Sequence, residues 1–199
     1  MKLKISLFFL FVTGFSNAQI SEKAKVLAKP LEAFSYAESR YIGIGGDKST
    51  LYDHFRKLSK VASTDDLYYL AKNGSNALRL YSSQELMKRN DKRFLEIYEY
   101  YLNYPSIIKY KDGCVGREEN ISDHLKRELY SVKDLIQLRD SLLKEKTDHF
   151  TKAQLESINE NGYRHLSQEN LDFYIAAIKK TDAKQLSSLD QSQPITHSK

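Results

Sequence analysis

Two residues whose types could support nucleophilic catalysis lie close together in the sequence, Cys114 and His124. A cysteine nucleophile needs an oriented base, which a histidine can supply, and donors for the oxyanion. The pair would suit a hydrolase or a transferase, but no neighbouring motif specifies the oxyanion donors. Cys114, which stands between Gly113 and Val115, could equally be a small buried apolar residue with a structural role. We therefore expect no catalytic residue and keep this enzyme site as an alternative.

The segment 41–50 invites a phosphate-binding interpretation because three glycines precede Lys48 and Ser49. A phosphate loop requires Gly-Lys-Ser/Thr directly after a strand, and here Asp47 separates Gly46 from Lys48. The carboxylate would also repel a phosphate group. The segment instead predicts a flexible corner, with Ser49 or Thr50 capping the next helix.

No set of residues has the spacing of a metal site. The sequence contains neither HExxH nor a paired CxxC motif, and Asp65 and Asp66 lack the alternating oxygen ligands of a calcium loop. We expect neither a metal nor another cofactor. The histidines are scattered along the chain at His54, His124, His149, His165 and His197.

The first 18 residues have the features of a secretory signal peptide. Lys2 and Lys4 precede an apolar run over 5–15, and small residues at 16–18 offer a cleavage site before Gln19. This run is shorter than the roughly 20 residues that span a bilayer. We expect an exported protein, periplasmic or secreted, without a stable membrane span after cleavage; an uncleaved anchor is the alternative.

Composition limits the class of partner. The chain has 199 residues and a formal net charge of +5, with acidic and basic residues interspersed. Loss of Lys2 and Lys4 with the signal peptide would lower this charge further, so the balance does not indicate nucleic-acid binding. Cys114 is the single cysteine, and stability must therefore come from packing rather than from an internal disulfide.

The segment 73–104 predicts a helix, a polar corner and a second helix. Asn73-Gly74 ends the preceding helix, and Ser75 or Asn76 caps the next one. Asn90-Asp91 forms the corner, and Tyr104-Pro105 ends the second helix. Both helices are apolar on the sides that would face each other, whereas Arg79, Lys88 and Arg89 are left for water. The facing positions are Leu78, Tyr81, Ser82 and Leu86 on the first helix, and Phe94, Leu95, Tyr98, Tyr101 and Leu102 on the second.

The region 42–125 resembles a group of exported bacterial proteins of uncharacterised function that carry HEAT-like repeats. The matching segments are Gly-Gly-Asp-Lys-Ser from Gly45, Ala-Ser-Thr-Asp-Asp-Leu-Tyr-Tyr-Leu from Ala62, and Asn-Ala-Leu-Arg-Leu-Tyr-Ser-Ser-Gln-Glu-Leu from Asn76. Arg79, Ser82 and Leu86 occupy the Arg, Ala and Leu positions of a HEAT helix, with serine replacing alanine. The resemblance implies a helical fold that binds proteins through one face, and it carries over no catalytic residue.

We therefore predict an all-α fold, a short α-solenoid of antiparallel HEAT-like helix pairs, with an irregular helical bundle as the runner-up. Residues 19–181 would form this domain, and the polar segment 182–199 would be a disordered tail. A helical pattern is expected from 20 to 41, and the segment 106–113 is compatible with a short helix or a strand.

The expected function is a non-enzymatic interaction module or scaffold that binds a protein or peptide partner. The chain has fourteen tyrosines, clustered most tightly over 98–104, so some of them should be exposed. Tyrosine and arginine often carry binding energy at interfaces. We place Arg79, Tyr100 and Tyr104 on the contact face, although Arg79 would serve equally to bond a neighbouring corner. Glycan binding through exposed tyrosines is a further alternative.

Overall fold

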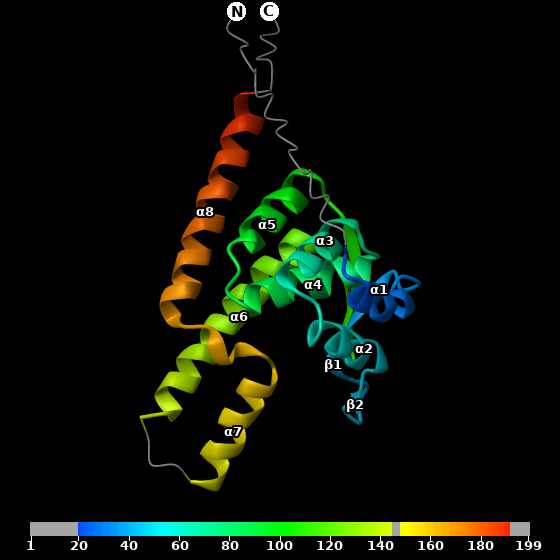
Figure 1. The fold of residues 1–199 in the computed structure, drawn as a ribbon. Helices are drawn as coiled ribbons and strands as arrows, with labels where there is room; N and C mark the ends of the chain where they lie inside the picture. The colour runs from blue at the N-terminus through cyan, green and yellow to red at the C-terminus, as the bar shows by residue number, and fades with distance from the viewer. Residues whose placement is uncertain (1–19, 145–147, 192–199) are drawn as a thin grey trace, which may run out of the picture.

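The computed structural model describes residues 20–144 and 148–191, so the expected signal peptide lies outside the described residues. Helices dominate, and four strands form one sheet (Figure 1). In chain order the elements are α1 (Glu22–Ala28), η1 (Lys29–Leu31), β1 (Tyr36–Ile42), β2 (Asp47–Lys48), α2 (Thr50–Ser59), α3 (Thr64–Asn73), α4 (Asn76–Lys88), α5 (Arg93–Asn103), β3 (Ile107–Gly113), β4 (Val115–Asn120), α6 (Ile121–Leu142), α7 (His149–Glu160), η2 (Tyr163–His165) and α8 (Gln168–Gln191).

The sheet makes the predicted all-α fold wrong, for the solenoid and for the irregular bundle alike. Its strand order is β2-β1-β3-β4. β1 and β3 pair in parallel, with Ala37 opposite Tyr110, whereas β1–β2 and β3–β4 are antiparallel. The fold is therefore mixed α/β. Parallel pairing of strands distant in sequence needs a long connection, and here that connection contains α2 to α5.

The missed strand β1 carries a weak hydrophobic pattern. In Tyr36–Ile42 only Ala37 is fully buried, while the residues on either side are half-buried or exposed. A strand with one buried residue does not show the apolar alternation that identifies a half-buried strand. The expected helical pattern over 20–41 is therefore correct for α1 and wrong for β1. β3 settles the open choice for residues 106–113 in favour of a strand.

The predicted helix pair is confirmed, with its boundaries. Ser75 is the N-cap of α4, and its hydroxyl accepts a hydrogen bond from the N–H of Leu78. Asn90 makes the corner in the left-handed conformation, with φ of 55°, and α5 ends at Asn103, just before Tyr104 and Pro105. Ser49 caps α2 as expected. These boundaries depend on local chemistry, which a sequence records directly.

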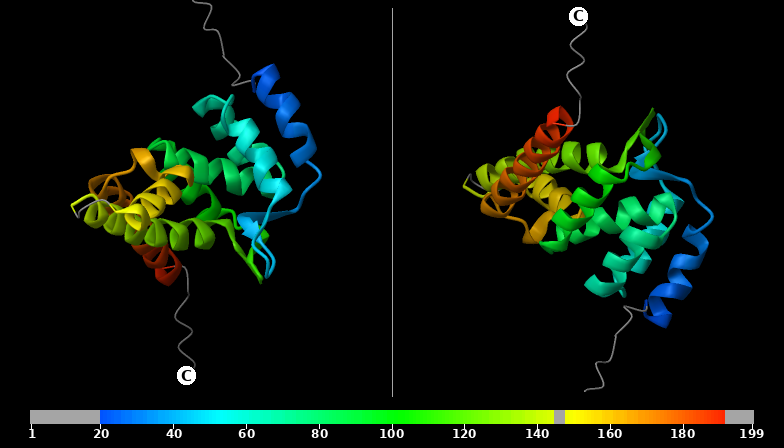
Figure 2. Two further views of the ribbon diagram at one scale, coloured as in Figure 1. Left: turned by 90° about the horizontal axis from the view of Figure 1, so that it is seen from below. Right: turned by 90° about the horizontal axis from the view of Figure 1, so that it is seen from above.

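Helix α4 lies at the centre of the molecule. It contacts α2, α3, α5, α6, β1 and β3, and both its apolar and its small polar residues are buried. The views in Figure 2 show α4 enclosed between α1–α3 on one side and α6–α8 on the other. A helix enclosed in this way can present polar side chains to a hollow between the elements that surround it. Its buried residues are Ala77, Leu78, Leu80, Tyr81, Ser82, Ser83, Gln84, Leu86 and Met87.

Helix α8 packs against α5 and α6 and continues to Gln191, past residue 181, where we expected the folded part to end. The Asp182 carboxylate accepts hydrogen bonds from the Tyr98 hydroxyl at 2.6 Å and from the Lys126 ammonium at 2.5 Å. Residues 192–199 of the expected tail lie outside the described residues. In the described part of the chain, no helix combines the length and apolarity needed to cross a bilayer.

Candidate functional site

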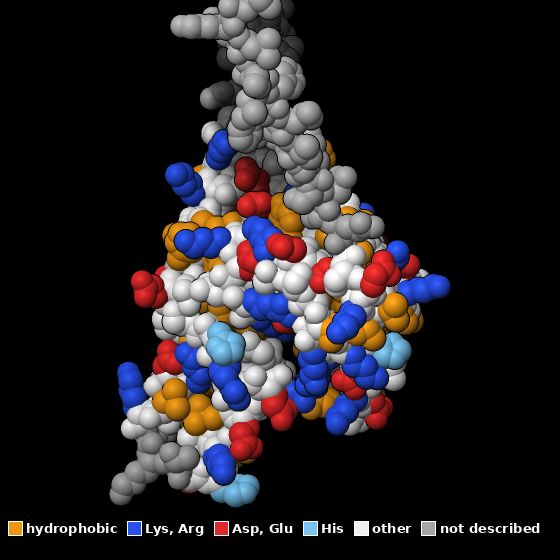
Figure 3. Space-filling model, viewed as in Figure 1, with side chains coloured by type: hydrophobic (Ala, Val, Ile, Leu, Met, Phe, Trp, Pro, Cys, Tyr) orange, Lys and Arg blue, Asp and Glu red, His pale blue; other side chains and the backbone are white. Residues whose placement is uncertain are grey.

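A cavity of about 420 Å³ lies between the sheet, helices α2, α4 and α6, and the corner that follows α7. Figure 3 shows the surface hollowed between the α7 part and the α2–β2 part of the molecule. Its volume falls within the roughly 300–1,000 Å³ of small-ligand pockets. Polar and aromatic side chains dominate the lining. The lining residues are Ser39, Arg40, Tyr41, Tyr52, Gln84, Lys88, Tyr110, Asp112, Gly113, Glu128, Leu135, Asn161 and Tyr163.

Two helices each contribute polar side chains to this cavity or its wall. Gln84 and Lys88 lie four residues apart on α4, and His124 and Glu128 lie four residues apart on α6. Residues at this spacing share one helix face. The Gln84 amide donates a hydrogen bond to the Glu128 carboxylate at 2.6 Å, which joins the two helices across the cavity wall.

Lys88 lines the cavity and lies near two of its tyrosine rings. Its ammonium lies 5.2 Å from the ring centroid of Tyr163 and 6.0 Å from that of Tyr52. Cations are attracted to aromatic faces at such distances. With the described residues, Lys88 forms neither a hydrogen bond nor an ion pair. A half-buried ammonium therefore faces the cavity with spare donor capacity.

Lys88 remains charged despite its partial burial. Burial alone would lower the pKa of its ammonium, but the neighbouring Tyr163, Tyr52, Glu128 and Glu85 raise the pKa above its usual value. The cavity thus presents a permanent cation.

The corner after α7 brings Tyr163 over Lys88. Gly162 makes this turn with φ of 90°, a conformation that favours glycine. A Cβ at Gly162 would lie 3.2 Å from Cδ of Lys88, so the backbone itself approaches the lysine stem. From α6, the Arg139 guanidinium donates hydrogen bonds to the carbonyls of Tyr163 and Leu166 at 3.1 and 2.9 Å and fixes η2.

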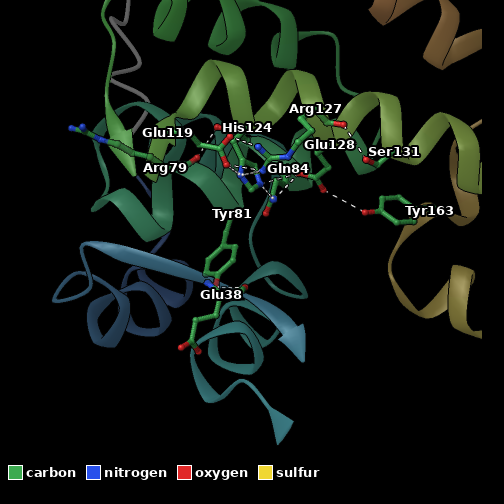
Figure 4. A network of polar contacts seen from close by, with 11 residues as sticks. Glu38, Arg79, Tyr81, Gln84, Glu119, His124, Arg127, Glu128, Ser131 and Tyr163 are labelled. Atoms are coloured by element: carbon green, nitrogen blue, oxygen red, sulfur yellow. Dashed lines mark hydrogen bonds and ion pairs between the residues drawn. The ribbon is translucent and has the colours of Figure 1, made fainter. Parts of the chain in front are cut away.

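A buried charged network supports the inner wall (Figure 4). Nδ1 of His124 lies 3.0 Å from a Glu119 oxygen, and Nε2 lies 3.2 Å from the Gln84 amide nitrogen. Arg127 also binds Glu119. Burial raises the pKa of Glu119, but the hydrogen bonds from Arg127 and His124 outweigh it and lower the pKa overall, so the carboxylate stays ionised.

Two of the tyrosine hydroxyls at the cavity, those of Tyr110 and Tyr163, stay protonated. Burial, together with nearby carboxylates, raises the pKa of both Tyr110 and Tyr163. The Tyr163 hydroxyl donates to Glu128 at 3.4 Å. The hydroxyls of Tyr52 and Tyr110 have no hydrogen-bond partner among residues 20–144 and 148–191, nor do the side chains of Asp112 and Asn161. The cavity therefore offers a set of uncommitted donors and acceptors.

The alternative catalytic pair is not assembled in the described structure. Cys114 is exposed in the turn between β3 and β4. His124 is buried at the start of α6, and both its ring nitrogens already have polar neighbours. No interaction between the two residues occurs among the described contacts. The same residues contain no cluster of three or more His, Cys, Asp or Glu side chains that could hold a metal ion.

The three predicted contact residues are only partly brought together. The rings of Tyr100 and Tyr104 lie 5.3 Å apart, and Tyr104 is 67% exposed. The described contacts join Arg79 to neither ring. Its Nε is buried without a hydrogen-bond partner among the described residues, and in Figure 4 its side chain points away from Glu128 and Tyr163. The expected bond from Arg79 to a neighbouring corner is likewise not formed by any described residue.

A second hollow, of about 530 Å³, lies over β1, β3 and β4. It is larger, but Lys109, Lys111, Arg117 and Glu118 around it are all exposed. Exposed charged side chains are common on any sheet face that meets water. This hollow therefore gives a weaker indication of a ligand than the cavity around Lys88.

No local pattern in the sequence indicates the Lys88 site. Lys88 lies near the polar end of a helix, and we expected it to face water. Its environment comes from Tyr52, Glu128 and Tyr163, which are distant along the chain. The spacing of Gln84 and Lys88, together with that of His124 and Glu128, could have suggested two polar helix faces, but not that they meet. Comparisons with protein-family models, curated proteins and solved structures find no match for this chain.

Proposed function

We propose that this chain is a non-enzymatic exported module that binds a protein or peptide partner, and that the cavity around Lys88 receives part of that partner. Export rests on the sequence of residues 1–18 alone. The observation that carries the proposal is the ammonium of Lys88, which faces a cavity without a hydrogen-bond partner among the described residues.

The lining of the cavity favours binding. Glu128 and Glu85 balance the charge of Lys88, but its ammonium keeps N–H donors without a partner among the described residues. A ligand that accepted hydrogen bonds from this ammonium would form charge-assisted bonds, which are the strong ones. Tyr52, Tyr110 and Asn161 add polar groups that lack partners among the described residues. Pockets of this kind combine a shaped aromatic wall with a few polar groups that orient the ligand.

Two contacts favour a binding role over the alternative hydrolase or transferase at Cys114 and His124. A base must lie within hydrogen-bond reach of the proton that it removes. His124 instead spans Glu119 and Gln84 inside the protein, while the Cys114 thiol lies in an exposed turn. The histidine is better placed to hold the cavity wall than to activate the cysteine.

A peptide pool tests the proposal. The purified protein is immobilised and exposed to a pool of random heptapeptides, and retained sequences are identified by mass spectrometry. We expect a distinct set of sequences on the natural protein and its loss on Lys88→Met, which keeps the aliphatic stem. Lys57→Met, at an exposed position of α2 outside the cavity, is the matched control and should retain the set. An absence of enriched sequences, or equal retention by Lys88→Met, contradicts the proposal.

A further inference from the structure

We infer that the cavity recognises a carboxylate, and specifically the free carboxyl terminus of a peptide chain, with Lys88 as its cationic anchor. This inference rests on the proposed function and names the chemical group that the site selects. It is carried by the position of Lys88 near the rings of Tyr52 and Tyr163, by the charges around it and by the uncommitted hydroxyls that share the cavity.

The first step concerns the sign of the ligand's charge. Lys88 is the cation of the cavity that lacks an ion-pair partner among the described residues. Arg40, the other cation in the lining, is paired with Glu160 at 2.7 Å. Glu128 accepts hydrogen bonds from Gln84 and Tyr163 on its two oxygens. Asp112, the other carboxylate in the lining, also lacks an ion-pair partner among the described residues, but it is exposed to water whereas Lys88 is half-buried. The position beside Lys88 is therefore one for an anionic acceptor.

The second step concerns the size of that charge. Glu85 and Glu128 already balance part of the positive field at Lys88. A phosphate monoester carries about −1.5 to −2 charges at neutral pH and would be repelled by these carboxylates. A carboxylate carries a single charge. It accepts one hydrogen bond from the ammonium and others from tyrosine hydroxyls, and charge-assisted bonds of this kind are the strong ones.

The third step concerns the shape of the site. Residues from β1, α2, α4, β3, α6 and the α7–η2 corner surround the cavity. A surface hollow bounded by several elements accommodates the end of a chain better than a segment that passes across it. Asp112 is exposed and Asn161 half-buried, and neither side chain has a partner among the described residues. Both can accept hydrogen bonds from the N–H groups of the last peptide units.

The test uses the heptapeptides retained by the purified protein, each resynthesised as a free acid and as a C-terminal amide. Dissociation constants are measured by calorimetry for the natural protein, Lys88→Met, Lys88→Arg and the Lys57→Met control. We expect the acid to bind at least about tenfold more tightly than the amide to the natural protein and to Lys57→Met, which equals about 1.4 kcal/mol. This ratio should fall to near one in Lys88→Met and be partly restored in Lys88→Arg.

The outcomes separate the two proposals. Equal binding of acid and amide leaves the peptide partner standing and overturns the terminal carboxylate. An acid preference that persists in a folded Lys88→Met overturns the role of Lys88. If the protein binds an oligogalacturonate, another carboxylate ligand, and no peptide, the claim that the carboxylate belongs to a peptide is wrong. If it binds no peptide at all, both proposals are wrong. The acid-to-amide ratio on the unchanged protein decides the inference even if Lys88→Met fails to fold.

Discussion

The hydroxyl of Tyr81 on α4 binds both backbone groups of Glu38 on β1. It accepts a hydrogen bond from the N–H and donates one to the carbonyl, each at 2.7 Å. The Tyr81 ring is buried and packs against Phe55 and Tyr52 at 5.0 and 5.8 Å between centroids. One side chain thus holds the strand that supplies Ser39–Tyr41 against the helix that supplies Gln84 and Lys88, so it fixes two walls of the cavity.

Replacing Tyr81 by phenylalanine should lower stability. The variant keeps the ring but removes the hydroxyl, and two partly buried backbone groups lose their partner. Leaving such groups unsatisfied costs about 1–3 kcal/mol. Urea unfolding followed by circular dichroism measures this loss. Tyr69→Phe is the control, because Tyr69 is exposed and its hydroxyl has no partner among the described residues. An unchanged midpoint for Tyr81→Phe would show that this contact does not hold β1 in place.

The elements that could be predicted from the sequence are those whose boundaries depend on neighbouring residues. Ser49, Ser63 and Ser75 cap α2, α3 and α4, and each lies directly before an apolar periodic run. The sheet could not be predicted in the same way. β1 pairs with β3 through the backbone but buries only one residue fully, so it lacks the alternation of apolar and polar residues that identifies a strand in a sequence.

The candidate site was missed for a related reason. The residue types of Cys114 and His124 are those of a nucleophile and its base, yet the described structure does not bring the two residues together. Lys88 looked like a solvated helix residue, because the groups that make its position unusual are Tyr163 and Glu128. Tertiary packing decides which of many lysines lies in a cavity, and the sequence of one helix does not contain that information.

Asp66 should make stability depend on pH. Its carboxylate, 4% exposed, accepts hydrogen bonds from the N–H and hydroxyl of Ser21 and from the N–H of Ser63. Burial raises the pKa of Asp66, but these hydrogen bonds outweigh it and lower the pKa overall. A lowered pKa adds stability above the unfolded value of about 3.9, and that stability is lost as pH falls through the folded value.

We therefore expect Asp66→Asn to be less stable than the natural protein by about 1–3 kcal/mol at pH 7. The difference should shrink as pH falls below about 4. Urea unfolding of both proteins between pH 7 and pH 3 measures it. Asp134→Asn is the control at an exposed position without a described partner, and it should follow the natural protein throughout. A difference between Asp66→Asn and the natural protein that is constant with pH would contradict the account.

Alkylation of Cys114 should leave the protein unchanged in function. The thiol is exposed in a turn, so iodoacetamide should modify it at the rate of an ordinary thiol. Neither the melting temperature nor the retention of peptides should change, because Cys114 does not line the cavity. A thiol that reacts much faster than free cysteine, or a loss of binding on modification, would favour the alternative site at Cys114 and His124.

The contact face predicted from the sequence remains open to a direct test. Tyr100 and Tyr104 form a ring pair, and Lys72 lies over the Tyr100 ring at 5.7 Å. If this face binds the partner, Tyr100→Ala and Arg79→Ala should each weaken peptide retention while stability holds. Tyr104→Ala should shift the unfolding free energy by no more than about 0.5 kcal/mol, as exposed positions usually do. A large fall in the melting temperature of Arg79→Ala or Tyr100→Ala would show that the residue has a structural role. Full peptide retention by all three variants would contradict the prediction that this face binds the partner.

The most direct measurement is a nuclear magnetic resonance titration of the ¹⁵N-labelled protein with the tightest-binding free-acid heptapeptide. It reports where on the molecule the partner binds without any substitution. We predict that the largest amide shifts occur at Gln84, Lys88 and Gly113, which line the cavity, while amides over 100–104 stay in place. Shifts confined to 100–104, with the cavity amides unmoved, would contradict the claim that the cavity around Lys88 is the binding site.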